Sequence, residues 1–213
     1  MPNKNKYNTA ELVAVLSSRV LENNKVVFVG AGLPLISAAL AQRTHAPNLR
    51  ILFEGGIISP EILIGGLPLS TNESRAAYKA VMLPSPTDLF SLQQRGYIDY
   101  GFLGGAQIDK FGNLNTSFIG DSENPKVRLP GSGGGNDIIT SCTKTIIATH
   151  HEKRRFVEKV DFITSPGYLN GNKDRENSGL IFGKIYKVIT HLAIFEFDEK
   201  SKYVAMASVS RFH

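Results

Sequence analysis

The sequence has 213 residues, of which 42% are hydrophobic and 20% are charged, a balance that fits a globular chain with a substantial core. The formal net charge is +5, but the lysines and arginines are scattered and no basic run alternates with aromatic residues, which argues against nucleic-acid binding. No apolar run approaches the roughly 18 residues of a membrane span. The basic first residues also lack the apolar stretch of a secretion signal, so we expect a cytoplasmic protein without a membrane segment.

The first predicted elements alternate between helix and strand. Apolar residues recur at near-helical spacing over residues 7–22, with Thr9 as a candidate N-cap. Residues 25–29 form a β-branched run typical of a strand covered on both faces. Gly30-Ala31-Gly32 follows this strand, and an alanine- and leucine-rich stretch over residues 35–43 indicates a helix. Strand, glycine turn and helix in this order open a βαβ unit.

Glu54 is a carboxylate at the end of the next predicted strand, residues 49–53, and Gly55 and Gly56 follow it directly. In open α/β sheets ligands bind outside the carboxyl ends of the strands, so we expect Glu54 and the Gly30 turn to face one cleft. A carboxylate placed there can act as a base or a nucleophile. The structural alternative is a surface carboxylate after an edge strand, or an N-cap of the next segment.

The remaining elements continue the alternation of helices, strands and glycine turns, with no repeat and no low-complexity linker. We therefore expect a single domain over residues 1–213. Helices are predicted near residues 74–82 and over 87–94, strands over 97–103, 143–149 and 160–164, a hairpin turn over 109–115, and two edge-like strands over 184–190 and 192–197.

A glycine-rich loop lies at residues 131–135, where four of five positions are glycine, and an apolar helix start follows at Ile138. Glycine lets backbone N–H groups approach a ligand, and N–H groups gathered at a helix start favour an anion or an oxyanion. Tight turns are the structural alternative, and Asn136 with Asp137 is also a candidate cap for the following helix. The Gly30 turn lacks the spacing of a dinucleotide fingerprint.

Cysteine and histidine usage gives no sign of a metal centre. Cys142 is the only cysteine, which excludes an internal disulfide and a cysteine-rich metal site. The histidines lack the spacing of a zinc motif, so we expect structural or surface roles for them and no bound metal. They are His45, His150, His151, His191 and the terminal His213.

Six short motifs follow one another in order along nearly the whole chain. They are Gly30-Ala31-Gly32-Leu33-Pro34, Ala46-Pro47-Asn48-Leu49 leading to Glu54-Gly55-Gly56, Leu103-Gly104-Gly105-Ala106-Gln107, Asp109-Lys110-Phe111-Gly112-Asn113-Leu114-Asn115, Gly131-Ser132-Gly133-Gly134-Gly135-Asn136-Asp137 and His151-Glu152-Lys153-Arg154-Arg155-Phe156. Together they resemble the β subunit of family I coenzyme A transferases, and within that family the glutaconate CoA-transferase type.

The resemblance implies an α/β fold, an open three-layer α/β/α sandwich with a mostly parallel sheet. It also implies an acyl-CoA:carboxylate CoA-transferase that works with a homologous α subunit as a hetero-oligomer, with the active site at the interface. Coenzyme A would be part of the substrate, and no permanently bound cofactor is expected. Members of this family usually continue for some tens of residues beyond the point where this sequence stops, so we expect a C-terminal segment to be lacking.

The resemblance also implies roles for particular residues. Glu54 matches the family's catalytic glutamate in a Glu-x-Gly motif and would attack an acyl-CoA thioester in a ping-pong cycle through a glutamyl-CoA thioester. The loop residues Gly133, Gly134 and Gly135, with Asn136 as a polar neighbour, would bind CoA and the acyl group or supply oxyanion donors. Gly30 and Gly32 are further binding candidates. Lys153, Arg154 and Arg155 are possible cations for the CoA phosphates, with a solvated helix face as their structural alternative.

Two other functions share this set of motifs. One is a subunit of a CoA-dependent hydrolase that opens a cyclic or steroid-derived CoA ester, with the catalytic glutamate supplied by the α subunit. The other is a non-catalytic structural subunit of such a complex.

Overall fold

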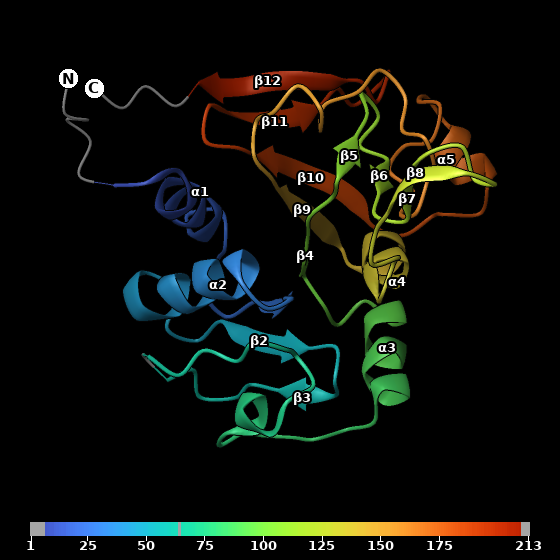
Figure 1. The fold of residues 1–213 in the computed structure, drawn as a ribbon. Helices are drawn as coiled ribbons and strands as arrows, with labels where there is room; N and C mark the ends of the chain where they lie inside the picture. The colour runs from blue at the N-terminus through green and yellow to red at the C-terminus, as the bar shows by residue number, and fades with distance from the viewer. Residues whose placement is uncertain (1–6, 64, 210–213) are drawn as a thin grey trace.

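The computed structural model describes residues 7–63 and 65–209, and one large sheet runs through this part of the chain (Figure 1). Its strand order is β12-β11-β10-β9-β4-β1-β2-β3. The strands are β1 (Val26–Phe28), β2 (Arg50–Phe53), β3 (Ile57–Ile58), β4 (Tyr100–Leu103), β9 (Lys144–Ala148), β10 (Lys184–Ile189), β11 (Ala193–Phe197) and β12 (Val204–Val209). The helical elements are α1 (Thr9–Ser18), α2 (Leu33–Thr44), the 3₁₀ turn η1 (Ser74–Ala77), α3 (Pro86–Gln94), α4 (Gly135–Ser141) and α5 (Asp174–Asn177).

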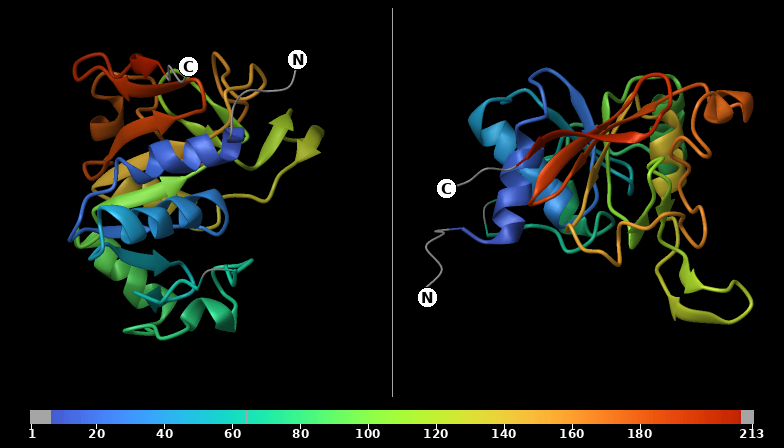
Figure 2. Two further views of the ribbon diagram at one scale, coloured as in Figure 1. Left: turned by 90° about the vertical axis from the view of Figure 1, so that its left-hand side faces the viewer. Right: turned by 90° about the horizontal axis from the view of Figure 1, so that it is seen from above.

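The centre of the sheet is parallel and its margins are antiparallel. Strands β2, β1, β4, β9 and β10 pair in parallel, while β3, β11 and β12 join as antiparallel neighbours. Two small antiparallel pairs lie outside the sheet: β5 (Gln107–Ile108) with β6 (Leu114–Asn115), and β7 (Phe118–Gly120) with β8 (Pro125–Arg128). The β7–β8 hairpin extends away from the body of the molecule in the right-hand view of Figure 2.

Helices cover both faces of the sheet, α1 and α2 on one and α3 and α4 on the other (Figure 1). Successive side chains of a strand point to opposite faces. Val27 and Val29 accordingly join the core beneath α1 and α2, whereas Phe28 joins Leu89 and Ile138 of the other face. The predicted three-layer α/β/α sandwich is confirmed.

Two helix predictions differ from the structure, one in the capping residue and one in the length of the helix. Helix α1 is capped by Asn8 rather than Thr9, because Asn8 accepts the N–H of Glu11 at 2.9 Å and Glu11 accepts the N–H of Asn8 at 2.8 Å. This reciprocal pair is a capping box. The helix predicted near residues 74–82 is wrong beyond η1. Lys79 has a positive φ of 49°, and the following residues run beside β3, with Val81 donating to Ile58 at 3.0 Å.

Three strand predictions differ from the structure, because hydrogen bonding between distant segments of the chain, rather than local composition, decides which residues form strands. Residues 160–164 form no strand; Thr164 donates to the carbonyl of Leu114 at 2.9 Å, and the one isolated bridge here joins Leu114 to the following residue, Ser165. The side chain of Asp161 accepts the N–H of Gly120 at 2.8 Å and holds this segment in place. The two segments predicted as edge-like, now β10 and β11, are both internal, since β12 forms the edge of the sheet beyond them. Strand β12 was not predicted.

No helix in the described ranges, 7–63 and 65–209, is long and apolar enough to cross a membrane.

Candidate active site

The candidate site lies where the connections of the sheet change direction. Strands β2 and β4 pair with opposite sides of β1, and the chain reaches them over opposite faces, through α2 and through α3. At such a switch point the carboxyl ends of parallel strands leave a crevice. A cavity of about 350 Å³ occupies it. Its lining comes from strand ends, from α2, from the glycine loop and from α4: Phe28, Val29, Gly30, Ala31, Pro34, Glu54, Phe102, Leu103, Gly104, Ser132, Gly134, Gly135, Ile138 and Ala148.

Glu54 opens the three-residue connection of the β2–β3 hairpin, in which Phe53 pairs with Ile57. The N–H of Gly56 donates to the carbonyl of Phe53 at 3.1 Å, and Gly56 has φ +82°. A turn that ends with a glycine in the left-handed region is a common three-residue hairpin connection. Glu54 is therefore held at the strand end by backbone geometry, which only glycine at position 56 satisfies without strain.

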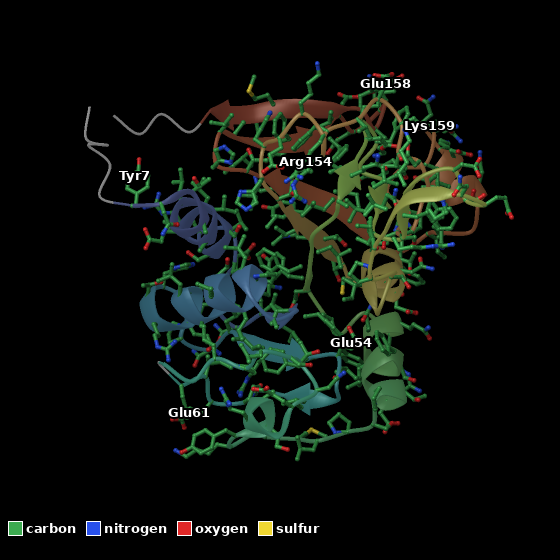
Figure 3. All side chains as sticks on the ribbon, viewed as in Figure 1. Tyr7, Glu54, Glu61, Arg154, Glu158 and Lys159 are labelled. Carbon is green, nitrogen blue, oxygen red and sulfur yellow. The ribbon has the colours of Figure 1, made fainter. Side chains whose placement is uncertain are left out.

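The two glycines after Glu54 also allow close packing of the next segment of chain. A Cβ at Gly55 would come 2.7 Å from the carbonyl oxygen of Thr71, and a Cβ at Gly56 would come 2.1 Å from that of Pro84. The Glu-Gly-Gly motif therefore has a structural cause in the backbone packed behind it. Figure 3 shows Glu54 near the middle of the molecule, beside α3.

The carboxylate of Glu54 lies against the glycine loop. The Cβ position of Gly133 is 3.8 Å from its Oε1, and that of Gly134 is 3.2 Å from its Oε2. Glu54 is half-buried, and its carboxylate makes no hydrogen bond or ion pair with residues 7–63 or 65–209. A half-buried carboxylate without a protein partner is free to react with a ligand.

Helix α4 follows this loop directly, and close contacts of its residues 137–139 set its position. A Cβ at Gly101 in β4 would come 2.4 Å from Cγ2 of Ile138, so the bare glycine lets α4 pack directly on the strand. The buried guanidinium of Arg175 donates to the carbonyl of Ile139 at 2.8 Å. On the α3 side, the amide of Gln93 donates to the carbonyl of Asp137.

The structure brings some of the predicted site residues together and separates others. Glu54, Gly30, Gly134 and Gly135 line one cavity, and Gly133 lies beside the Glu54 carboxylate. Gly32 is the residue before α2, with φ +81°, and does not line the cavity.

Asn136 lies inside helix α4, is exposed to solvent and is not part of the cavity lining. The helix is preceded by Gly134 and has no side-chain cap, so the capping role considered for Asn136 and Asp137 is wrong. The glycine loop continues directly into the helix, which leaves no position at which either side chain could cap it.

Sequence reasoning missed Ser132, which lines the cavity, and Phe90, which packs against the glycine loop and against Phe28 without lining it. Phe90 of α3 would touch a Cβ at Gly134 at 3.1 Å, and its ring stacks on that of Phe28 with centroids 5.8 Å apart. Ser132 lines the cavity, and its carbonyl accepts the N–H of Gly135 at 2.8 Å. No local pattern marks Phe90, because its helix reaches the site only through packing on α4.

The predicted phosphate cations are not on a helix face, since residues 153–155 form a turn. Arg154 and Arg155 both pair with Glu152, at 2.6 Å and 3.3 Å, and the bond from Arg154 is the main cause that lowers the pKa of Glu152. Arg155 also donates to the carbonyl of Gly105 at 3.0 Å, which ties this turn to the glycines after β4. In Figure 3 Arg154 lies toward the upper side of the molecule, whereas Glu54 lies lower, near its middle.

Three histidines gather beyond the carboxyl ends of β9 and β10. The ring of His191 is 6.2 Å from that of His150 and 6.5 Å from that of His151. Burial first, and then the neighbouring histidine charges, lower the pKa of His191 below its ordinary value, while Glu152 opposes the shift. Over the described residues no group of His, Cys, Asp and Glu has metal-binding geometry.

Comparison with known proteins gives a consistent family. A sequence model described as Coenzyme A transferase matches residues 10–207. The β-type subunit of 3-oxoadipate CoA-transferase from Pseudomonas knackmussii is 39% identical over 204 residues, which are 95% of this chain and 78% of that protein. The β-type subunit of glutaconate CoA-transferase from Acidaminococcus fermentans is 38% identical over 209 residues, 95% of this chain and 77% of that protein.

Solved structures extend this likeness to the fold. Glutaconate coenzyme A-transferase from Acidaminococcus fermentans matches with a TM-score of 0.89 and 36% identity, over 96% of this chain and 80% of that chain. A cholesterol ring-cleaving hydrolase IpdB subunit from Mycobacterium tuberculosis is 30% identical over 95 residues, 45% of this chain and 37% of that protein. In sequence the transferase subunits thus match along nearly the whole chain and the hydrolase subunit along less than half, whereas the solved IpdAB structure from Rhodococcus jostii shares the fold over 96% of this chain and 79% of that chain, with 23% identity and a TM-score of 0.75.

Proposed function

This chain belongs to the coenzyme A transferase family, and on that premise we propose that Glu54 is the nucleophile of an acyl-CoA:carboxylate CoA-transferase in which the chain is the β-type subunit. The observation that carries the proposal is the unpaired Glu54 carboxylate, placed in a cavity at the carboxyl ends of the strands and against Gly133 and Gly134. The steroid-hydrolase alternative is not favoured, since the sequence likeness to that hydrolase subunit is 30% identity over 45% of the chain, against 39% and 38% over 95% for the two transferase subunits.

The proposed cycle is ping-pong and needs no oxidant, reductant or net proton transfer. A carboxylate oxygen of Glu54 attacks the thioester carbon of an acyl-CoA, the C–S bond breaks, and CoA thiolate leaves an acyl-glutamyl anhydride. The thiolate then attacks the Glu54 carbonyl carbon, which releases the first carboxylate and leaves a glutamyl-CoA thioester. An acceptor carboxylate attacks that thioester, and the thiolate returns to the acceptor carbon, so that Glu54 is free again.

The site supplies what this chemistry requires of the protein. A carboxylate is a weak nucleophile in water, and the apolar walls around Glu54, including Phe28 and Leu103, limit its hydration. Positioning against the thioester carbon can contribute about 7–11 kcal/mol of the barrier. The backbone N–H groups of Gly133 and Gly134 make no hydrogen bond in the described chain and are the proposed oxyanion donors. Loss of one such donor typically costs about 2.7–4 kcal/mol.

Coenzyme A is a substrate in this scheme rather than a resident cofactor. The partner is a homologous α-type subunit, and together the two form a hetero-oligomer, as the subunit names of the related transferases indicate. The acids named in those relatives, 3-oxoadipate and glutaconate, are short dicarboxylic acids and are the first acceptors to assay.

A trapping experiment tests the proposal. The complex with its α-type subunit is incubated with acyl-CoA and then treated with borohydride, which reduces a glutamyl thioester to an alcohol. We expect inactivation that depends on acyl-CoA and a mass change confined to the peptide containing Glu54. Modification at another residue, or acyl-CoA consumed without transfer to an added carboxylate, would refute the assignment.

A further inference from the structure

Helix α3 contacts both the glycine loop and helix α4 with one face. Phe90 and Gln93 are three positions apart in α3, so their side chains lie on the same side of the helix. A Cβ at Gly134 would come 3.1 Å from the ring of Phe90. The buried amide of Gln93 donates to the carbonyl of Asp137, in the first turn of α4. One helix face therefore supports the loop and also the helix that follows it.

The side chains of Phe90 and Glu54 converge on Gly134. The Cβ position that is 3.1 Å from the Phe90 ring is also 3.2 Å from Oε2 of Glu54. Phe28, which lines the cavity, stacks on Phe90 with ring centroids 5.8 Å apart and supports the ring from another side. Because protein interiors are close-packed, a change in the size of residue 90 shifts the loop relative to the carboxylate. The Phe90 ring thus sets the spacing between the loop and Glu54.

Gln93 has a feature that packing alone does not explain. It is fully buried, and its Oε1 has no hydrogen-bond partner in residues 7–63 or 65–209. An unpaired buried oxygen costs free energy, which an apolar side chain of similar size would avoid. What glutamine provides instead is a directional bond from Nε2 to Asp137. This bond fixes the orientation of the first turn of α4, and Gly134 immediately precedes that turn.

We propose that Phe90 and Gln93 are positioning residues of the CoA-transfer reaction, which hold Gly133 and Gly134 at the spacing from Glu54 that the transition state requires. Phe90 acts through the bulk of its ring, and Gln93 acts through its bond to α4. Neither side chain lines the cavity. This inference rests on the proposed function, in which Glu54 is the nucleophile and the N–H groups of the loop are the oxyanion donors.

Gln93→Met tests the bond between α3 and α4. Methionine has a similar length and removes both the bond and the unpaired oxygen, while the carbonyl of Asp137 still accepts the hydroxyl of Thr140 at 3.2 Å. The melting temperature should therefore not fall. In the complex with the α-type subunit, kcat for CoA transfer should fall by about tenfold, and KM for acyl-CoA should change by less than about twofold. A purely structural role would lower the melting temperature and leave kcat unchanged.

Gln42→Met is the matched control for Gln93→Met. Gln42 is a partly buried residue of α2 that also donates through Nε2 to a backbone carbonyl, that of Leu49, at 2.7 Å. It lies outside the cavity lining. Its substitution should leave kcat unchanged, so a loss confined to Gln93→Met identifies the bond to α4 as the cause.

Phe90→Leu tests the role of the ring and should by itself lower kcat by about tenfold. Combined with Gly134→Ala, its effect should reverse, because the smaller leucine gives the added methyl group room to move away from Oε2 of Glu54. We expect the double variant to be at least about threefold more active than Gly134→Ala alone. Phe195→Leu is the control, since Phe195 is also partly buried, packs on Phe156 with centroids 5.9 Å apart and does not line the cavity.

The possible outcomes separate this inference from the proposed function. If Gln93→Met transfers CoA as fast as the native complex, or if the losses of Phe90→Leu and Gly134→Ala simply add, the positioning role is wrong and the function stands. If Phe90→Leu does not fold, which its melting temperature shows, Gln93→Met decides alone. If the native complex transfers no CoA, or if Glu54→Gln stays active, the proposed function fails and this inference fails with it.

Discussion

Gly134 and Glu54 lie so close that a Cβ at position 134 would come 3.2 Å from Oε2 of Glu54, and it would also come 3.1 Å from the ring of Phe90. Gly134→Ala should therefore displace the carboxylate by a few tenths of an ångström while leaving the fold intact. Because near-attack geometry is sensitive to small displacements, we expect kcat to fall by about 10- to 100-fold. Steady-state kinetics measure this. Gly66→Ala is the control, since its Cβ would meet only Leu63, at 3.5 Å. Equal losses of kcat in the two variants would contradict the prediction.

Removing the nucleophilic oxygen without changing side-chain size should abolish transfer. Glu54→Gln keeps the shape of the side chain but cannot form the anhydride, and we expect a loss of activity on the order of 10⁴-fold or more. Transfer of CoA between two acids by the reconstituted complex is the measurement. Glu61→Gln is a suitable control, because Glu61 pairs with Lys79 at 2.8 Å and lies outside the cavity. Activity of Glu54→Gln within about tenfold of the native complex would exclude a nucleophilic role.

The turn that holds Glu54 should be intolerant of a side chain at Gly56. That residue has φ +82°, and its Cβ would come 2.1 Å from the carbonyl oxygen of Pro84, so strain and overlap act together. We expect Gly56→Ala to lower the free energy of unfolding by about 2–4 kcal/mol. Gly65→Ala separates the two causes, because Gly65 has φ +76° but nothing within 4 Å of its Cβ, and only strain of about 1 kcal/mol is expected. Urea unfolding measures both, and similar losses would show that the contact with Pro84 yields easily.

Arg175 should be essential for stability although it lies outside the cavity. It is 3% exposed and donates to the carbonyls of Pro166, Gly167, Ile139 and Phe182. Arg175→Met would leave these buried acceptors unsatisfied, and we expect a loss of at least about 3 kcal/mol in the free energy of unfolding. Chemical denaturation measures the loss. Arg19→Met, on the surface at the end of α1, should be nearly neutral; comparable losses for the two arginines would be evidence against the buried network.

Stability should decline slightly with acid through His191. Its pKa in the folded chain is lowered, first by burial and then by His150 and His151, with Glu152 opposing, from an ordinary value of 6.5. A lowered histidine pKa means that the unfolded chain binds the proton more readily, so stability falls as pH drops below 6.5. Because His191 is only partly buried, we expect less than about 1 kcal/mol. Unfolding at about pH 7 and about pH 5.5 should show a smaller difference in His191→Gln than in the native chain, and an unchanged difference would exclude this histidine as the cause.

Much of the fold followed from local patterns. The β-branched run before Gly30 and the strand before Glu54 were recognised because strands buried on both faces are continuously apolar, and β1 and β2 lie within the predicted ranges. The hairpin around residues 109–115 was recognised for its turn residues and is present as β5 and β6. Predictions failed at residues 160–164 and 78–82, where long-range backbone pairing overrode composition.

The sequence by itself determined that a carboxylate ends a buried strand, that two glycines follow it and that a glycine-rich loop precedes a helix, because burial and backbone freedom leave local signatures. Only the tertiary structure decided that Glu54 lies against Gly133 and Gly134, with Phe90 packed against Gly134 and Asn136 outside the cavity. The physical reason is strand order. The pairing of β2 and β4 on opposite sides of β1 brings distant segments to one crevice, and no local pattern encodes which strands will become neighbours.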